Sequence, residues 1–265
     1  MANFLGKQLG ICSLLMGCFS CTVYTPMQPH APLIRAKGEG EVLLQVQPSL
    51  RPELSAAYSP VRNLLVLGGI TARSRMPVPV GNGEENGMRF EKDNFRTLQY
   101  EAGLGGYLPI SKGWTAQLIG GVGDAHVRRR VVEPAIIFGG FCADFEARYR
   151  KSFGQLGLNY QDQSDAFGLG YRMTNVVFRQ LAVQKCCGDY AFYELPLPNQ
   201  VRHEVFAFFR SSLSKPLNES RWQFQGACTM SFTPRSKSAL NQSFYLKYTQ
   251  NNSFLVSIGG TYFLR

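Results

Sequence analysis

The chain has 265 residues, 28 of them basic and 18 acidic, which gives a formal net charge of +10 at pH 7. This length fits one large all-β domain, and the positive charge favours partners that carry phosphate, without choosing between nucleic acid and anionic lipid. No apolar run approaches the roughly 20 residues that a transmembrane helix needs, so a membrane could be reached only through an anchor or through strands.

Residues 1–20 have the anatomy of a secretory signal: Lys7 is basic, an apolar stretch follows it, and small residues end it. The letters LMGC, which end at Cys18, resemble a bacterial lipobox and make Cys18 a candidate for lipidation. Cys21 is a second candidate, because the small residue Ser20 precedes it. The sequence therefore predicts export, with either cysteine lipidated or the signal simply removed.

Residues 21–38 are predicted to form a tether between this signal and the first strand. The letters CFSC from Cys18 to Cys21 would need a following helix to form a redox site, and Pro26, Pro29 and Pro32 exclude one. Prolines at this spacing keep a segment extended and stiff. We therefore expect an extended connection without redox chemistry.

From residue 39 to residue 265, apolar and polar residues alternate with period two, as in strands with two different faces. In residues 221–233, for example, Trp222 and Phe224 lie on one face and Gln223 and Gln225 on the other. The predicted strands are residues 41–47, 54–59, 63–72, 98–108, 114–122, 141–150, 156–160, 167–173, 205–211, 221–233, 244–248 and 253–265. Roughly ten to twelve such strands predict an all-β fold, an antiparallel up-and-down barrel of the outer-membrane type, in one domain over residues 39–265.

Short and long connections alternate between these strands. Short turns are predicted at residues 109–113, around Lys151 and at Asn251 and Asn252, where asparagine tolerates positive φ. Long connections are predicted at residues 74–94, 124–140 and 175–202.

The placement of aromatic residues indicates which face meets lipid. On the apolar face they lie near both ends of several strands, as the girdles of a membrane barrel do. These pairs are Phe141 and Tyr149, Trp222 and Phe232, Phe244 and Tyr248, and Phe254 and Tyr262. The polar face carries glycines and charges of both signs, which suit a lumen largely filled by side chains, although the solvated face of a soluble domain would also be polar. The predicted luminal charges are Glu101, Asp144, Glu146, Arg148, Arg150, Arg172 and Arg221.

The phrases ELSAAYSPVRNLLV, ARYRKSFGQLGLNY, AFGLGYRMTNVVF and SIGGTYFLR, together with the lipobox-like LLMGCFSC, resemble uncharacterised outer-membrane β-barrel-like proteins of Bacteroidetes. The resemblance covers most of the chain and rests on strand texture. It implies a β-barrel in the outer membrane of a Gram-negative bacterium, and it implies no activity.

The sequence gives only weak indications of a metal site or a catalytic site. Asp124 and His126 are too few for a metal site, and no cofactor motif is present. His203, Glu204 and Ser211 have the residue types of a hydrolase, but nothing in their spacing selects them.

Four cysteines lie in the predicted barrel: Cys142, Cys186, Cys187 and Cys228. The adjacent Cys186 and Cys187 cannot easily bridge each other, but either could pair with a loop cysteine. Cys228 is expected to be a small lipid-facing residue.

The basic residues Arg128, Arg129 and Arg130 are predicted to lie in a long loop close to the membrane. Anionic lipid headgroups are their expected partner, and nucleic acid is not, because no stacking aromatics are interleaved with them.

The sequence thus predicts an exported barrel with a structural, adhesive or narrow-transport role rather than an enzyme. The alternative is a surface-anchored lipoprotein whose soluble β domain binds a small or lipidic ligand. A lipid-modifying hydrolase that uses His203 and Ser211 is the third hypothesis.

Overall fold

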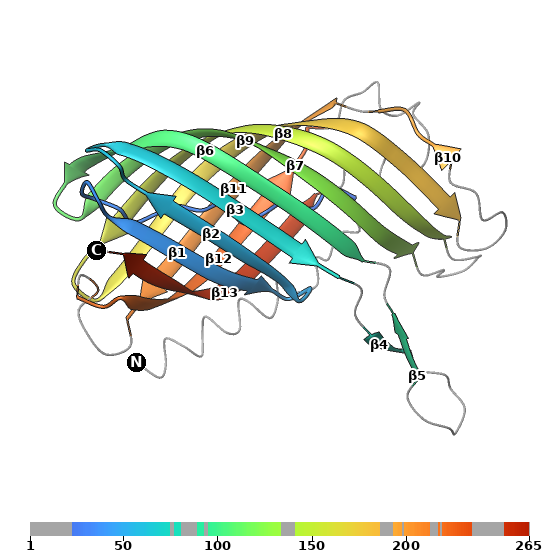
Figure 1. Ribbon diagram of the computed structural model, residues 1–265, viewed down its shortest axis with the longest axis horizontal. Coiled ribbons are helices and arrows are strands. Elements are labelled where there is room, and N and C mark those ends of the chain that lie inside the picture. The colour runs from blue at the N-terminus through green and yellow to red at the C-terminus, as the bar shows by residue number, and fades with distance from the viewer. Residues whose placement is uncertain are drawn as a thin grey trace.

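The computed structural model describes residues 23–74, 77–80, 89–92, 95–133, 141–185, 193–197, 199–212, 217, 219–234 and 252–264. Ten antiparallel strands form a closed barrel (Figure 1). They are β1 (Gly40–Gln47), β2 (Arg51–Tyr58), β3 (Leu64–Arg73), β6 (Arg96–Ser111), β7 (Trp114–Glu133), β8 (Phe141–Gln161), β9 (Asp165–Lys185), β11 (Asn199–Ser211), β12 (Trp222–Phe232) and β13 (Ser253–Leu264). Two short strands, β4 (Pro77–Val80) and β5 (Arg89–Lys92), form a separate hairpin, and β10 (Tyr193–Glu194) extends the edge of β9. In the part of the chain described, no helix is long and apolar enough to cross a membrane.

The strands follow one another around the barrel in chain order, and β13 closes it by pairing with β1. One end, the turn end, carries the short turns at residues 59–63, 112–113 and 162–164 and the last residues of β13. The opposite end, the loop end, carries the β4–β5 hairpin and β10 (Figure 1), and the short turn between β1 and β2 also lies there. The predicted barrel of ten to twelve strands is confirmed with ten.

Strands β7, β8 and β9 are longer than the sequence indicates. The predicted turn at Lys151 is wrong, because β8 continues through it and Lys151 pairs with Gly123 and Val176. The predicted loops at residues 124–140 and 175–202 begin later, since β7 runs to Glu133 and β9 to Lys185. Polar side chains are compatible with a strand when both of its edges are paired, and a single sequence does not reveal that pairing.

The outward face of the strands is apolar. In β11 and β12 buried and exposed residues alternate, and exposed leucines, valines and isoleucines point away from the lumen on nearly every strand. We call this band the apolar belt. Its outward aromatics at the turn end are Tyr58, Trp114, Tyr160, Phe167, Phe209, Trp222 and Tyr262. Several of these rings touch; Trp114 and Tyr160, for example, have centroids 5.1 Å apart.

The height of the belt fits a bilayer. On β12, Trp222 lies at the turn end and Phe232 at the loop end. Ten residue steps of about 3.3 Å at a tilt of about 40° span roughly 25 Å along the barrel axis, the height of the apolar band of membrane barrels. The predicted outward orientation of these aromatics is confirmed.

The first half of β8 has the reverse orientation from the one predicted. Phe145 and Tyr149 are fully buried inside the barrel, whereas Arg148 and Arg150 point outward and are exposed. This half of β8 lies toward the loop end, beyond the apolar belt, so its outer surface is charged and its inner surface packs apolar residues. Of the other aromatic pairs, Phe244 and Tyr248 lie outside the described residues, as does Asn251 of the predicted turn.

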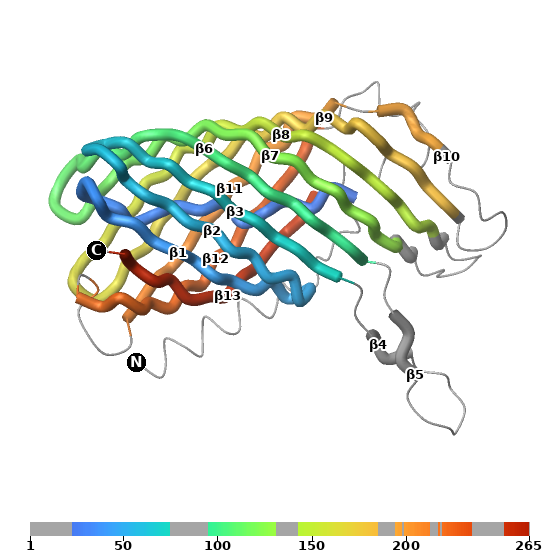
Figure 2. Tube along the Cα trace, viewed as in Figure 1, coloured from blue at the N-terminus to red at the C-terminus, as the bar shows by residue number. Residues whose placement is uncertain are grey.

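The proline-rich segment lies inside the barrel (Figure 2). It is extended, as predicted, but residues 23–34 are all buried, so it fills the lumen instead of lying outside as a free tether. We call residues 23–35 the luminal segment. Each hydrophobic cluster of the barrel contains residues from it: Val23 and Tyr24, Ala31 and Leu33, and Ile34.

Candidate functional site

The luminal segment crosses the barrel from one end to the other. Val23 packs with Val127, Phe145 and Val183 near the loop end. At the turn end Arg35 donates a hydrogen bond of 2.6 Å to the carbonyl of Gly113 in the β6–β7 turn. Twelve residue steps at about 3.3 Å make a path of roughly 40 Å, similar to the full thickness of a bilayer. The luminal segment therefore fills the lumen along its whole length.

Side-chain amides of the barrel wall recognise the carbonyl groups of this segment. Gln99 Nε2 donates to the carbonyl of Thr25 at 2.7 Å, and Gln155 Nε2 donates to the carbonyl of His30 at 2.8 Å. Pro32 accepts from both Gln117 and Asn159, and Pro26 accepts from the Arg51 guanidinium. Carbonyls near prolines have no strand partner, so the wall supplies the donors that a neighbouring strand would otherwise provide.

Carboxylates of the wall recognise its N–H groups. Glu41 accepts from the backbone N–H of Leu33 at 3.0 Å and from His30 Nε2 at 2.7 Å. Glu53 accepts from the backbone N–H of Gln28 at 3.1 Å. Hydrogen bonds to ionised acceptors are about twice as strong as those between neutral groups, so the hydrogen bonds to these two glutamates are the strongest between the wall and the segment.

A second set of contacts holds the tyrosine at the entry of the segment. The Tyr24 hydroxyl donates to Glu204 Oε1 at 3.1 Å, and the Arg202 guanidinium lies 4.3 Å from the centre of the Tyr24 ring. The Tyr24 and Tyr149 rings have centroids 5.5 Å apart. An aromatic ring between a guanidinium and another ring is well suited to a desolvated site.

Ion pairs cross the lumen between strands that are not neighbours. Arg210 on β11 donates to Glu41 on β1 at 2.9 and 3.1 Å. Glu101 on β6 lies 3.0 Å from Lys151 and 3.2 Å from Arg172. The buried charges on the inner face of the described wall are four acidic and five basic residues. They are Glu41, Glu53, Glu101, Glu204, Arg51, Lys151, Arg172, Arg202 and Arg210.

Some buried polar atoms in the lumen have no hydrogen-bond partner among the described residues. Gln99, Gln117 and Asn159 donate to the segment, but their amide oxygens accept from no described group, and neither side-chain polar atom of Gln28 is paired. A proline has a backbone carbonyl but no N–H group, so the prolines of the segment cannot donate to these amide oxygens. Each buried polar group without a partner costs about 1–3 kcal/mol, and the hydrogen bonds that the segment does form offset this cost.

The predicted luminal charge cluster divides into three groups. Glu101 and Arg172 are in the lumen and form an ion pair. Asp144 is buried but lies on the outer side of β8, where it pairs with Arg130 at 2.9 Å, so its predicted luminal position is wrong. The prediction is also wrong for the remaining residues, which lie on the outside: Glu146, Arg148, Arg150 and Arg221. Sequence reasoning missed Glu41, Glu53, Glu204, Arg51, Lys151, Arg202 and Arg210, although each falls on an inward position of an alternating strand.

The predicted basic loop is part of a strand. Arg128, Arg129 and Arg130 all lie in β7, near the loop end of the barrel. Arg128 is directly opposite Arg96 on β6 and Glu146 on β8. The basic run thus belongs to the outer wall and the mouth of the barrel.

The three residues of the hydrolase hypothesis do not converge. His203 lies on the outer side of β11 and contacts the Tyr171 hydroxyl, whereas Glu204 points into the lumen. Ser211 lies eight residues further along the same strand, about 26 Å away.

No group of three metal-ligating side chains is present in the described ranges, and Asp124 and His126 instead face Arg150 and Glu146. Cys228 is half-buried on the outward face. The lipidation candidates Cys18 and Cys21 lie outside the described residues, and so do Cys186, Cys187 and the side chain of Cys142.

No protein-family model matches the sequence, and no curated protein is significantly similar to it. Among solved structures, the translocator domain of the autotransporter NalP from Neisseria meningitidis is similar with a TM-score of 0.45 and 9% identity, over 98% of this chain and 95% of that one. The toluene transporter TodX of Pseudomonas putida has a TM-score of 0.36 and 14% identity, over 89% of this chain and 69% of that one. The CymD monoaromatic hydrocarbon channel has a TM-score of 0.33 and 9% identity, over 87% and 89%.

Proposed function

We propose that the protein is an outer-membrane β-barrel of a Gram-negative bacterium and forms a narrow channel that its own luminal segment closes. The observation that carries this proposal is the continuous occupation of the lumen by residues 23–35. The wall contacts this segment through amides and carboxylates directed at its backbone. Solute would pass only when the segment moves away from these groups.

The apolar belt supports a membrane location. A soluble β domain would leave exposed residues such as Leu118 and Leu169 in contact with water around the circumference, which soluble monomers avoid. An even number of strands, with three short turns at one end and most of the longer connections at the other, is typical of outer-membrane barrels. By that rule the turn end faces the periplasm and the loop end faces the outside of the cell.

The polar lining supports a channel for small hydrophilic solutes. Without the segment, the wall would present ion pairs such as Glu101 with Arg172, and amides such as Gln117 and Gln155. A ten-stranded barrel has a narrow interior, so the expected opening is far smaller than that of a 16-stranded porin. Because the inner face carries four acidic and five basic buried residues, we expect only a weak preference for anions over cations.

Conductance across planar lipid bilayers tests the proposal. The full chain should show almost no current, and a variant that lacks residues 23–34 should show small, discrete steps. Lower mobility of the boiled than of the unboiled protein on a detergent gel verifies that the variant has folded into a barrel. A folded deletion variant that stays as closed as the full chain would contradict the channel proposal.

A milder change provides a second arm of this experiment. Replacing both Gln99 and Gln155 by leucine removes two donors to the segment carbonyls but leaves the chain intact. Brief openings should become more frequent in this variant. The matched control is Gln223→Leu, because Gln223 donates to the carbonyl of Leu217 and not to the segment. Equal opening frequencies in the two variants would show that the segment contacts do not control closure.

A further inference from the structure

The barrel wall binds Tyr24 differently from most of the luminal segment. Elsewhere the wall holds the segment mainly through backbone groups, such as the carbonyl of His30 and the N–H of Leu33. At Tyr24 the wall contacts the side chain, and the ring and the hydroxyl each have partners of their own. The group that this part of the wall recognises is therefore a phenol.

Three kinds of contact surround the phenol group of Tyr24. The Arg202 guanidinium lies over the ring, 4.3 Å from its centroid. The Tyr149 ring lies beside it with centroids 5.5 Å apart, and Phe178 packs against Tyr149 at 5.3 Å. The hydroxyl donates to Glu204 Oε1 at 3.1 Å. A cation, an aromatic ring and an acceptor thus match the π face, the edge and the hydroxyl of a phenol.

The groups that form this site belong to the wall and do not depend on the segment. Arg202 and Glu204 are two residues apart on the inward face of β11, and both are fully buried. Glu204 also accepts from the hydroxyl of Thr174 on β9 at 3.3 Å and from that of Ser231 on β12 at 3.4 Å. These hydrogen bonds hold the carboxylate in place from two neighbouring strands. We therefore expect the site to persist when Tyr24 moves away.

The site lies near the loop-end entry of the lumen. Arg202 and Glu204 follow closely after Asn199, where β11 begins at the loop end. The hydrogen bonds from Gln155 and Gln117 to the segment lie further along its path toward the turn end. A solute that enters from the loop end meets this site before it meets those amides.

We propose that Arg202, Glu204 and Tyr149 form a binding site for a small, water-soluble phenol, and that Tyr24 occupies this site while the barrel is closed. A phenol that takes the place of the Tyr24 ring releases the entry of the luminal segment. Phenols are then the solute class that the channel admits. This last step rests on the channel function proposed above, whereas the binding site itself does not.

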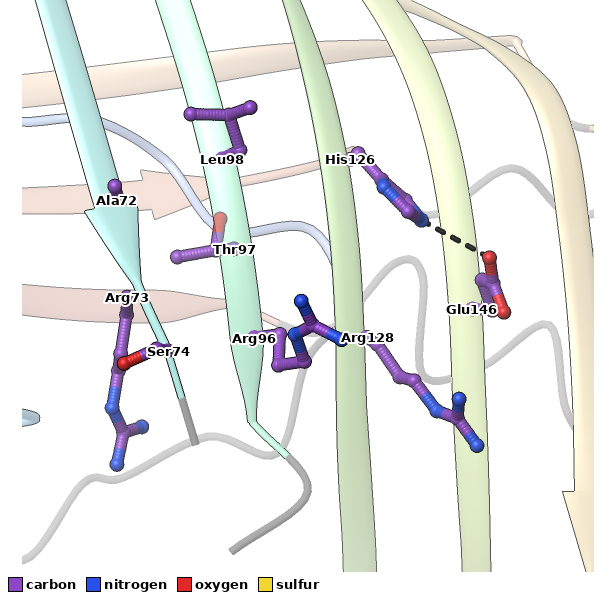
Figure 3. Close-up of a pocket in the computed structure, with 9 residues that line it drawn as sticks. All are labelled: Ala72, Arg73, Ser74, Arg96, Thr97, Leu98, His126, Arg128 and Glu146. Atoms are coloured by element: carbon purple, nitrogen blue, oxygen red, sulfur yellow. Dashed lines mark hydrogen bonds and ion pairs between the residues drawn. The ribbon is translucent and has the colours of Figure 1, made fainter. Parts of the chain in front are cut away.

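The pocket on the outer wall of the barrel is a poorer environment for a phenol. Its volume is about 360 Å³, and Arg96, Arg128, His126 and Glu146 are among the residues that line it (Figure 3). The Arg128 side chain extends away from Arg96, and the Glu146 carboxylate accepts a hydrogen bond of 3.0 Å from His126. Arg96 and His126 are exposed to solvent, whereas Arg202 is not. A cation attracts an aromatic ring most strongly when it is desolvated, which favours the luminal site.

The test is a fluorine NMR titration of the Tyr24→Ala variant, folded in detergent micelles, with para-fluorophenol. The substitution removes the ring and leaves a cavity of its shape, and cavities of this kind bind matching small molecules. We expect the variant to bind at least about 10-fold more tightly than the parent, in which the tethered Tyr24 competes at an effective concentration on the order of millimolar. Partition into micelles is common to both proteins. Equal binding by the variant and the parent would overturn the proposal.

A second cavity variant is the matched control. Tyr107→Ala removes another buried tyrosine ring from the lumen, near the turn end, where the Tyr107 hydroxyl lies 3.3 Å from the Ser59 hydroxyl and not beside a carboxylate. It should bind para-fluorophenol about 10-fold more weakly than Tyr24→Ala, because hydrogen bonds to ionised acceptors are the stronger ones. Gel mobility of the unboiled proteins verifies that both variants have folded. Equal affinities would show that any luminal cavity suffices, which contradicts a specific site.

The hydroxyl and its acceptor are tested separately from the ring. Fluorobenzene lacks the hydroxyl and should bind Tyr24→Ala about 10-fold more weakly than para-fluorophenol does. The Tyr24→Ala/Glu204→Gln variant keeps the shape of the site but removes the charge of the acceptor, and it should lose a similar factor for para-fluorophenol only. Fluorobenzene binding as tightly as para-fluorophenol would assign the cavity to apolar molecules in general and reject the phenol site.

Current through the variant that lacks residues 23–34 separates this inference from the channel proposal. That variant has no Tyr24, so para-fluorophenol should block its current briefly over the concentration range in which it binds Tyr24→Ala. If the deletion variant carries no current, the channel proposal fails, and the NMR titration still decides whether the site exists. If the variant carries current that para-fluorophenol leaves unchanged, phenols are not the solute class of the channel.

Discussion

The Arg210 guanidinium binds both carboxylate oxygens of Glu41 across the lumen, although two strands separate β11 from β1 along the wall. The same carboxylate accepts from His30 and from the N–H of Leu33. Glu41 thus connects two strands that are not neighbours with the luminal segment in one group. A charge this deeply buried is tolerated only when its partners remain in place.

Replacing Glu41 by alanine should therefore lower the free energy of unfolding by about 3–5 kcal/mol, because it leaves the Arg210 charge buried and unpaired. Urea titration in detergent micelles, with the folded fraction taken from gel mobility, measures the change. The double variant Glu41→Leu/Arg210→Met should recover more than half of the loss, since it removes both charges. If the losses of the single variants simply add, the pair is not coupled.

Glycines on the inner wall make room for two phenylalanine rings. A Cβ atom on Gly170 would lie 2.1 Å from Phe206, and one on Gly168 would lie 2.2 Å from Phe208. We expect Gly170→Ala to destabilise the barrel by about 1–3 kcal/mol, because a packed ring and a strand cannot both retain their positions. Urea titration detects it. Gly154→Ala is the control, since its Cβ would meet nothing within 4 Å; a similar loss there would contradict the packing argument.

The apolar belt predicts a clear difference between two leucines. Leu169 and Leu50 are similarly exposed, at 61% and 58%, but Leu169 lies on the belt and Leu50 in the turn between β1 and β2. Leu169→Arg should cost about 1–3 kcal/mol in a lipid bilayer, because Leu169 lies between the turn-end aromatics and the bilayer midplane, whereas Leu50→Arg should be close to neutral. Folding titrations in phospholipid vesicles measure both. In a soluble domain neither substitution would matter, so equal stabilities would favour the lipoprotein alternative.

The sequence predicts the strands correctly, but it predicts less well which face of each strand points into the lumen. Alternation over residues 221–233 correctly separates an outward face with Trp222 from an inward face with Gln223. The pattern is regular here because the outward residues meet lipid and are apolar, whereas the inward residues are polar. On β8 the same alternation leads to the wrong orientation for Tyr149 and Arg148, since beyond the belt the outside is charged and the inside apolar. Period two defines two faces, but the medium that each face meets depends on depth along the barrel.

The luminal segment shows a second limit. Pro26, Pro29 and Pro32 correctly predict an extended chain without a strand partner. Its position in the lumen depends on donors such as Gln99 and Gln155, which are 74 and 125 residues away from the groups they bind. No local pattern contains that information.

The direction of the luminal segment predicts where the preceding chain emerges. Val23 lies near the loop end, and residues 24–35 occupy the path toward the turn end. A group inserted directly before Val23 is therefore expected at the loop end, which faces the outside of the cell in the proposed orientation.

An epitope tag inserted between Thr22 and Val23 should thus be accessible to antibody on intact cells. The control is the same tag beside Arg62, in the exposed turn between β2 and β3, which should become accessible only after the outer membrane is permeabilised. Flow cytometry of intact and permeabilised cells distinguishes the two positions. If the tag before Val23 is accessible only in permeabilised cells while the tag at Arg62 is accessible in intact ones, the proposed orientation of the barrel is reversed. If both tags behave alike, the segment does not cross the membrane.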